Sequence, residues 1–192
     1  MVASARRPCY HRRMTIYQTF TRSLVAVAAA LAMLACSASN NWRDYSSPDA
    51  PYRVMFPDKP AVHKRTIDLD GMKVEMTMTA VDRDGTIYAV GSAEAPDAAR
   101  ATAALAAMKT ALVRNIGATV TSEKASAQAS NPGGQRAALD VEANGVQNGT
   151  PMKLIGHFEA RDQRFYQVIV MGKAKAMPKE QVEQFITSFK LL

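Results

Sequence analysis

The sequence predicts an α+β domain in which an antiparallel β-sheet is flanked by two helices, in the order ββββ-α-ββββ-α. Three observations support this class. Short segments of alternating apolar and polar residues are joined by turns, which is typical of antiparallel strands. Two longer segments carry apolar residues at helical spacing. Residues 51–192 also have about the length of one ordinary domain.

Four strands are expected before the first helix. They lie at 52–56, 62–69, 72–80 and 86–93. Proline-rich and Asp-Gly turns separate them, because proline lacks the amide donor of a strand and Asp-Gly favours tight hairpins. The third strand has the clearest pattern, since Met72, Met76 and Met78 alternate with charged and hydroxyl residues. We therefore expect one face of this strand to lie in the core.

The first helix is expected directly after this group of strands. Asp97 is a suitable N-cap, and Leu105, Met108 and Leu112 follow at helical spacing. Gly117 stands where a glycine often ends a helix in the left-handed conformation. The segment after Pro96 therefore predicts an amphipathic helix packed on the sheet.

The second half of the chain repeats this layout. Four strands are expected, at 119–124, 139–142, 152–159 and 165–171. The last of them is apolar on both faces apart from Gln167, which indicates a central strand. Pro178 fits the first position of a closing helix with an apolar stripe formed by Val182, Phe185, Ile186 and Phe189.

The N-terminal residues 1–35 have the features of a signal peptide. They contain five arginines and no acidic residue, and 24–35 is an unbroken apolar run. This run of 12 residues is too short to span a bilayer, which takes about 20. Because a leader that starts at Met14 would have ordinary length, we interpret 1–13 as an extension that is not part of the natural protein.

The tetrad Met33-Leu34-Ala35-Cys36 resembles the lipobox of bacterial lipoproteins. This resemblance implies cleavage before Cys36, a diacylglycerol on its thiol, and a tether over 36–50 that leads to the domain. Ser37 then implies the outer membrane, with the protein facing the periplasm. Two alternatives stay open: cleavage without lipid within 35–39, which would give a soluble periplasmic or secreted protein, and an uncleaved signal anchor.

The net charge and the cysteine content of the domain differ from those of the whole chain, because the leader is basic and contains a cysteine. The whole chain carries a net charge of +7, but the leader holds five of its basic residues. The remainder has 19 basic and 17 acidic residues, so its net charge of about +2 argues against nucleic-acid binding. With Cys9 in the leader and Cys36 acylated, the domain has no disulfide.

The layout of residues 50–192 resembles the PsbP-like superfamily and small bacterial lipoproteins of similar order. The resemblance rests on an opening strand followed by FPDKP and on a final helix that reads QFITSFKLL. It implies an antiparallel sheet flanked by helices and an accessory or binding role. It transfers no functional residue, because members of this superfamily share no active site.

No catalytic, cofactor or metal constellation stands out in the sequence of the domain. His63 and His157 are its only histidines, and a metal site usually needs three or four ligands. The stripe of Met72, Met76 and Met78 could bind copper(I), but methionines that alternate with polar residues are typical of a core. The sequence also lacks a GxSxG or SxxK motif, so we expect no enzyme.

The leading prediction is therefore a membrane-tethered accessory or protein-binding module of the cell envelope. Its expected interaction surface is the outer sheet face at Lys153, His157 and Glu159, together with the loops 127–134 and 144–150. A second interpretation is a carrier of small molecules or lipids, with a cavity between sheet and helices. That cavity would be lined by Met76, Met78, Leu112 and Phe185. The third interpretation is an envelope enzyme without a recognisable motif.

Overall fold

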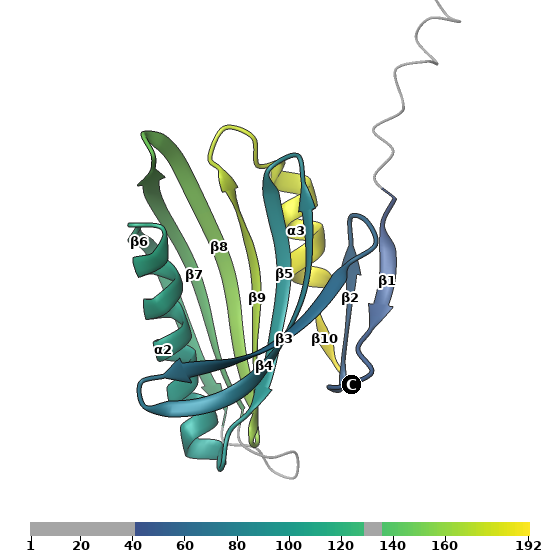
Figure 1. Cartoon of the computed structure of the whole chain (residues 1–192), viewed down its shortest axis with the longest axis vertical. Coiled ribbons are helices and arrows are strands. Elements are labelled where there is room, and N and C mark those ends of the chain that lie inside the picture. Colours follow the sequence, from purple (N-terminus) through teal and green to yellow (C-terminus); the bar gives the residue numbers. More distant parts are fainter. Residues whose placement is uncertain (1–40, 129–135) are drawn as a thin grey trace, which may run out of the picture. The chain divides into compact units, whose positions relative to one another are not determined.

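The computed structural model describes residues 41–128 and 136–192, which form ten strands and two helices (Figure 1). In chain order these elements are β1 (Arg43–Ser46), β2 (Tyr52–Phe56), β3 (Ala61–Leu69), β4 (Met72–Arg83), β5 (Thr86–Glu94), α2 (Ala98–Asn115), β6 (Thr119–Gln128), β7 (Arg136–Gln147), β8 (Thr150–Arg161), β9 (Arg164–Lys173), α3 (Lys179–Ser188) and β10 (Lys190–Leu191). The leader, Cys36 and most of the loop 127–134 lie outside the described residues.

The predicted α+β class is confirmed, but the predicted order ββββ-α-ββββ-α is wrong. β1 precedes the first expected strand and β10 follows the last helix. Neither has a pattern that sequence analysis could detect, because β1 has one half-buried residue and β10 has two residues in all. The expected tether over 36–50 is also too long, since β1 pairs with β2 and Ala50 is buried.

Seven of the described strands form one antiparallel sheet in the order β3-β4-β5-β9-β8-β7-β6. The chain goes from β5 through α2 to the far edge at β6, and returns by hairpins to place β9 beside β5. β9 is thus the central strand, as its sequence predicts. The segment 144–150, predicted as a loop, is mostly strand, and its turn is confined to Asn148-Gly149. The prediction missed these strand residues because they are largely exposed and show no alternation of apolar and polar side chains.

Helix α2 covers one face of the seven-stranded sheet. Its N-cap is Asp97, whose carboxylate accepts a hydrogen bond of 2.8 Å from the Arg100 amide. The buried positions follow helical spacing and are small or flexible: Ala101, Ala104, Leu105 and Met108. Met76 is 1% exposed in the same core, with Met72 and Met78 packed against it. The predicted core position of the methionine stripe is therefore confirmed.

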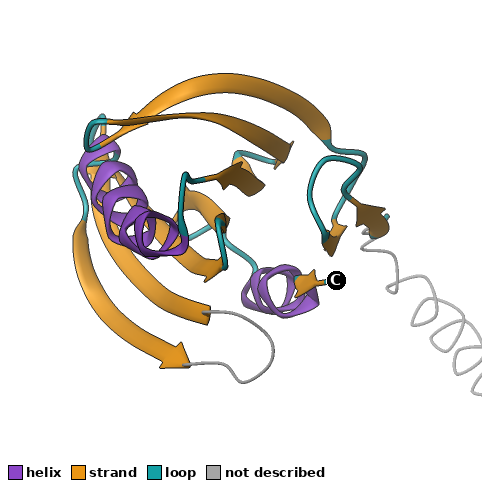
Figure 2. Ribbon diagram, turned by 90° about the horizontal axis from the view of Figure 1, so that it is seen from below, coloured by secondary structure: helices purple, strands orange, loops and turns teal. Residues whose placement is uncertain are grey.

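The opposite face is covered by α3 and by a three-stranded sheet in the order β1-β2-β10. Figure 2 shows the central strands between the two helices. This second core is largely aromatic: Phe185 of α3 lies 5.2 Å from Phe56 and 5.4 Å from Tyr88 between ring centroids. The Tyr52 hydroxyl meets the Thr79 hydroxyl at 3.2 Å, which satisfies both polar groups inside this core.

Replacing Phe185 tests whether the second layer is an integral part of the fold. Phe185 is fully buried, so Phe185→Ala should lower the free energy of unfolding by about 3–5 kcal/mol through lost burial and a cavity. Urea denaturation measures this change. Thr187→Ala, at an exposed position of the same helix, is the control. A loss below about 1 kcal/mol for Phe185→Ala would show that α3 is only loosely attached to the sheet.

Candidate functional site

The candidate site lies where the second layer ends on the sheet. α3 contacts β9 and β8, whereas the outer face of β7 carries the exposed residues Asp140, Glu142 and Asn144. A groove of about 470 Å³ opens at this step, and we call it the β8 groove. Its lining residues are Arg136, His157, Glu159, Arg161, Ile186, Thr187, Phe189, Lys190 and Leu191.

Strand alternation and register bring the polar residues of the β8 groove together. His157, Glu159 and Arg161 alternate along β8 and therefore point to one face. On β7, Asp140 stands opposite His157, and Arg136 stands opposite Arg161. Residues 17 to 25 positions apart in the chain thus share one surface because the hairpin turn at Asn148-Gly149 sets their register.

The centre of the groove is a row of alternating charges. Nδ1 of His157 lies 2.6 Å from Oδ1 of Asp140, and its Nε2 lies 3.3 Å from Oε2 of Glu159. The other carboxylate oxygen of Glu159, Oε1, lies 2.6 Å from Nε of Arg136 as an ion-pair contact without hydrogen-bond alignment. Glu159 is only 3% exposed, so these two partners compensate the charge of a buried carboxylate.

The two groups at the centre of this row stabilise each other's charged form. Burial lowers the pKa of His157, but the hydrogen bonds and charges of Glu159 and Asp140 outweigh it, so that its pKa is raised above 6.5. Burial raises the pKa of Glu159, but His157 and Arg136 outweigh it, so that its pKa is lowered below 4.5. Both groups are therefore charged in the interval between these two ordinary values.

Both ring nitrogens of His157 are engaged by carboxylates, Nδ1 by Asp140 and Nε2 by Glu159. The two carboxylates meet opposite edges of the ring and cannot converge on one ion. Within the described ranges, no group of three or more His, Cys, Asp or Glu side chains could hold a metal ion. The hydroxyl of Thr187 donates to the Glu183 carbonyl at 2.7 Å, which ties it to its own helix.

The rim of the β8 groove is basic and one of its walls is apolar. Arg161 and Lys190 form no ion pair with any part of the chain that the structure describes, whereas Arg136 is engaged by Glu159. The wall opposite β8 is formed by Ile186, Phe189 and Leu191 from the α3–β10 segment. The groove therefore combines unpaired positive charge with apolar surface, which is typical of recognition of an anion that carries an apolar part.

The structure separates the three residues of the predicted interaction surface. His157 and Glu159 line the β8 groove, but Lys153 lies near the other end of β8 and pairs with Glu142 at 2.9 Å. Glu159 is buried and His157 is half-buried, because the α3–β10 segment lies over this face of β8; the ring of Phe189 lies 6.2 Å from that of His157.

Three cations of the groove were absent from the sequence prediction. Arg161 continues the alternation of His157 and Glu159, so extending that pattern by two residues would have found it. Arg136 and Lys190 come from other strands, and no local signal connects them with β8.

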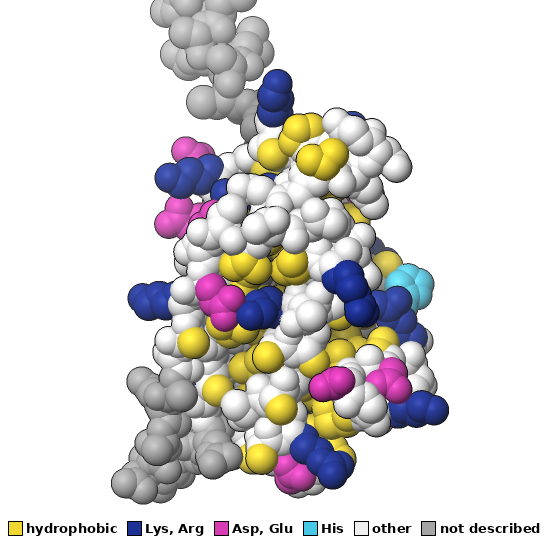
Figure 3. All heavy atoms as spheres, turned by 90° about the vertical axis from the view of Figure 1, so that its left-hand side faces the viewer, with side chains coloured by type: hydrophobic (Ala, Val, Ile, Leu, Met, Phe, Trp, Pro, Cys, Tyr) yellow, Lys and Arg dark blue, Asp and Glu magenta, His cyan; other side chains and the backbone are white. Residues whose placement is uncertain are grey.

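The residues expected to line a carrier cavity do not share one. Met76, Met78 and Leu112 pack in the core under α2, whereas Phe185 lies in the core on the opposite face of the sheet. A larger groove, of about 770 Å³, does lie between α2 and the tip of the β3–β4 hairpin. It is lined by residues of the β3–β4 turn and by a face of α2 that runs from Arg100 to Arg114 and consists largely of alanines; Figure 3 views the molecule from this side.

Comparison with known proteins leaves the geometry as the guide to function. No protein-family model matches the chain, and no curated protein matches it. Neither α2 nor α3, the helices of the described residues, is long and apolar enough to cross a membrane.

The raised pKa of His157 predicts a pH-dependent contribution to stability. A group with a raised folded-state pKa stabilises the fold fully below its unfolded pKa of 6.5 and loses this effect as pH rises through the folded value. His157→Gln should therefore lower the free energy of unfolding by on the order of 1 kcal/mol at about pH 6 and by less at about pH 9. Urea denaturation at both pH values measures the difference.

The matched control for this titration is His63→Gln. His63 is exposed on β3 and forms no ion pair among the described residues, so its replacement should change stability little at either pH. A His157→Gln effect that grows with pH would contradict the charge assignment of the groove.

Proposed function

We propose that this protein is a lipid-anchored component of the cell envelope that acts as a non-enzymatic binding module through the β8 groove. The single observation that carries this proposal is that some charged groups of the groove contact one another, whereas two of its cations do not take part in these contacts. Its acid–base groups, His157 and Glu159, are occupied by each other and by Asp140 and Arg136. Arg161 and Lys190 form no ion pair within the described ranges and lie beside an apolar wall. Such a surface can bind a partner, but it has no free group for proton transfer.

The proposed address rests on the N-terminal sequence. The lipobox-like tetrad that ends at Cys36 supports acylation, and Ser37 supports the outer membrane with the domain facing the periplasm. The described fold begins with β1 at Arg43, so only a few residues separate the proposed lipid from the domain. A groove held this close to a membrane would meet partners in or near that membrane. The resemblance to the PsbP-like superfamily supports the same accessory role.

Photo-crosslinking in the native host tests the binding role. Thr187→p-benzoylphenylalanine places the probe on an exposed residue of the groove, and Lys179→p-benzoylphenylalanine places it at the other end of α3 as the control. We expect a discrete adduct at position 187 that is absent at 179 and that is lost when Arg161→Glu is added. Equal labelling at both positions, or none at 187, would contradict a binding role for the groove.

The intact mass of the same protein extracted from membranes tests the address. A mass equal to residues 36–192 plus a diacylglycerol-modified cysteine is expected. An unlipidated chain that begins within 36–40 would contradict the anchor, and the crosslinking result would still decide the binding role.

A further inference from the structure

We infer that the β8 groove binds an extended peptide segment, which adds to β10 as a further strand and places a carboxylate side chain beside Arg161 and Lys190. This inference rests on the proposed binding function and names its ligand class. Three properties of the described residues carry it: a free strand edge, a surplus of positive charge and an apolar wall.

The free strand edge belongs to β10. β10 is the last strand of the sheet β1-β2-β10 and pairs with β2 through Lys190 and Leu191. On its other side no described strand pairs with it, and the same two residues line the β8 groove. An unpaired edge presents backbone amides and carbonyls that an extended chain can satisfy, and this is how many domains bind peptides.

The surplus charge indicates the side chain that this segment carries. Arg136 and Arg161 stand directly opposite each other on β7 and β8, a like-charged pair that destabilises a sheet unless an anion lies nearby. Glu159 neutralises Arg136, but neither Arg161 nor Lys190 on the facing strand has such a partner among the residues that the structure describes. A carboxylate placed between Arg161 and Lys190 would complete the charge balance of the groove.

The apolar wall accounts for the remaining surface. Phe189 is buried, and Ile186 and Leu191 are half-buried, so the wall still exposes apolar atoms to the groove. A peptide that alternates acidic and apolar side chains matches both surfaces, because successive side chains of a strand point to opposite faces. A membrane surface or a free anion would use the cations, but neither has amides and carbonyls to pair with the β10 edge.

Fluorescence anisotropy with a defined probe tests this inference. The probe is fluorescein-Gly-Gly-Val-Asp-Val-Asp-Val-amide, titrated with the full processed chain, and the matched control probe has Asn in place of both Asp residues. We expect binding of the Asp probe and at least about tenfold weaker binding of the Asn probe, because the neutral amide cannot pair with the cations. Arg161→Glu should weaken binding of the Asp probe by at least about tenfold.

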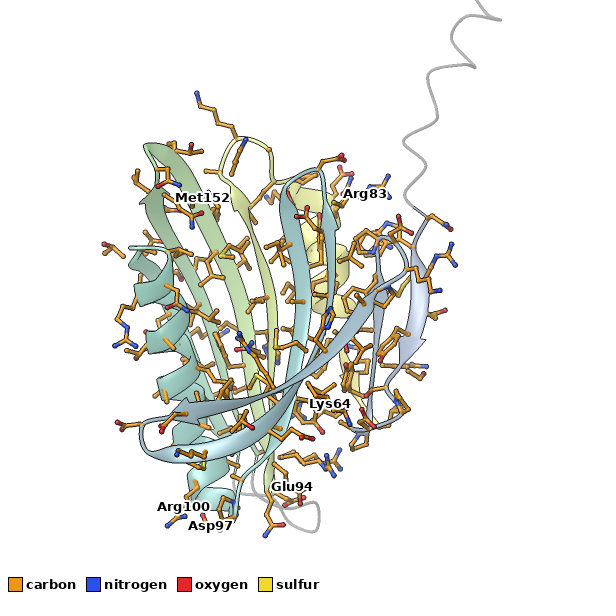
Figure 4. The ribbon with its side chains drawn as sticks, in the orientation of Figure 1. Lys64, Arg83, Glu94, Asp97, Arg100 and Met152 are labelled. Carbon is orange, nitrogen blue, oxygen red and sulfur yellow. The ribbon has the colours of Figure 1, made fainter. Side chains whose placement is uncertain are left out.

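Arg100→Glu is the matched protein control for the loss of a positive charge. Arg100 lies near the start of α2 (Figure 4), on the opposite side of the sheet from the β8 groove, so its charge reversal should leave binding unchanged. Unchanged circular dichroism and thermal unfolding of both variants would show that the fold is intact.

Backbone N-methylation distinguishes strand addition from other modes of binding. In antiparallel pairing only alternate amides face the neighbouring strand. N-methylation of one alternate set of residues in the probe should therefore abolish binding, whereas N-methylation of the other set should preserve it.

Two outcomes would overturn the inference and leave the proposed function intact. The first is equal binding of both N-methylated probes together with displacement by phosphatidylglycerol vesicles, which would identify an anionic lipid surface as the ligand. The second is the absence of probe binding while the adduct at position 187 still forms in the host, which would require a different ligand class. If neither the probe nor the adduct is detected, the proposed function fails as well.

Discussion

The structure depends on a sheet that is apolar on both faces along its centre. β9 alternates Phe165 and Ile169 toward one core with Tyr166, Val168 and Val170 toward the other, and all of them are buried. A strand of this kind is stable only when both faces of the sheet are covered. α2 supplies one cover, and the other is made from α3 and short strands at the two ends of the described domain. The small sheet β1-β2-β10 is therefore part of the core.

The extent of the second cover determines where the candidate site lies. α3 contacts β9 and β8, so the cover ends over β8. The outer face of the next strand, β7, is exposed. Glu159 stands at this boundary as a buried carboxylate, and it keeps its charge because His157 and Arg136 contact both of its oxygens. Among the residues that the structure describes, Arg161 and Lys190 at this boundary form no ion pair. The groove is thus a consequence of the fold, and its surplus of positive charge supports the proposed binding role.

The sequence was sufficient for the long elements of the fold and insufficient for the parts that depend on tertiary contact. Alternation and helical spacing identified the central position of β9, the Asp97 cap and the core methionines, because burial leaves a periodic pattern within each element. β1 and β10 are too short to carry a pattern. The burial of Glu159 was missed for a related reason: alternation assigns it to the polar face of β8, and only the position of Phe189 shows that this face is covered. Arg136 reaches the site through the register between β7 and β8, and Lys190 reaches it because the chain reverses after α3. The spacing of residues within one element predicts neither position.

The most informative measurement is the pKa of Glu159, because the charge row of the groove depends on a buried but charged carboxylate at the edge of the second layer. It can be measured from the carboxyl carbon in a pH titration by NMR. Burial alone would raise this pKa, but the contacts with His157 and Arg136 outweigh it, so we predict a value below 4.5. The stabilisation would then be present above pH 4.5 and lost as pH falls through the folded-state pKa. A value above 4.5 would mean that burial outweighs the contacts of Glu159 with His157 and Arg136, and it would contradict the charge row on which the proposed groove is built.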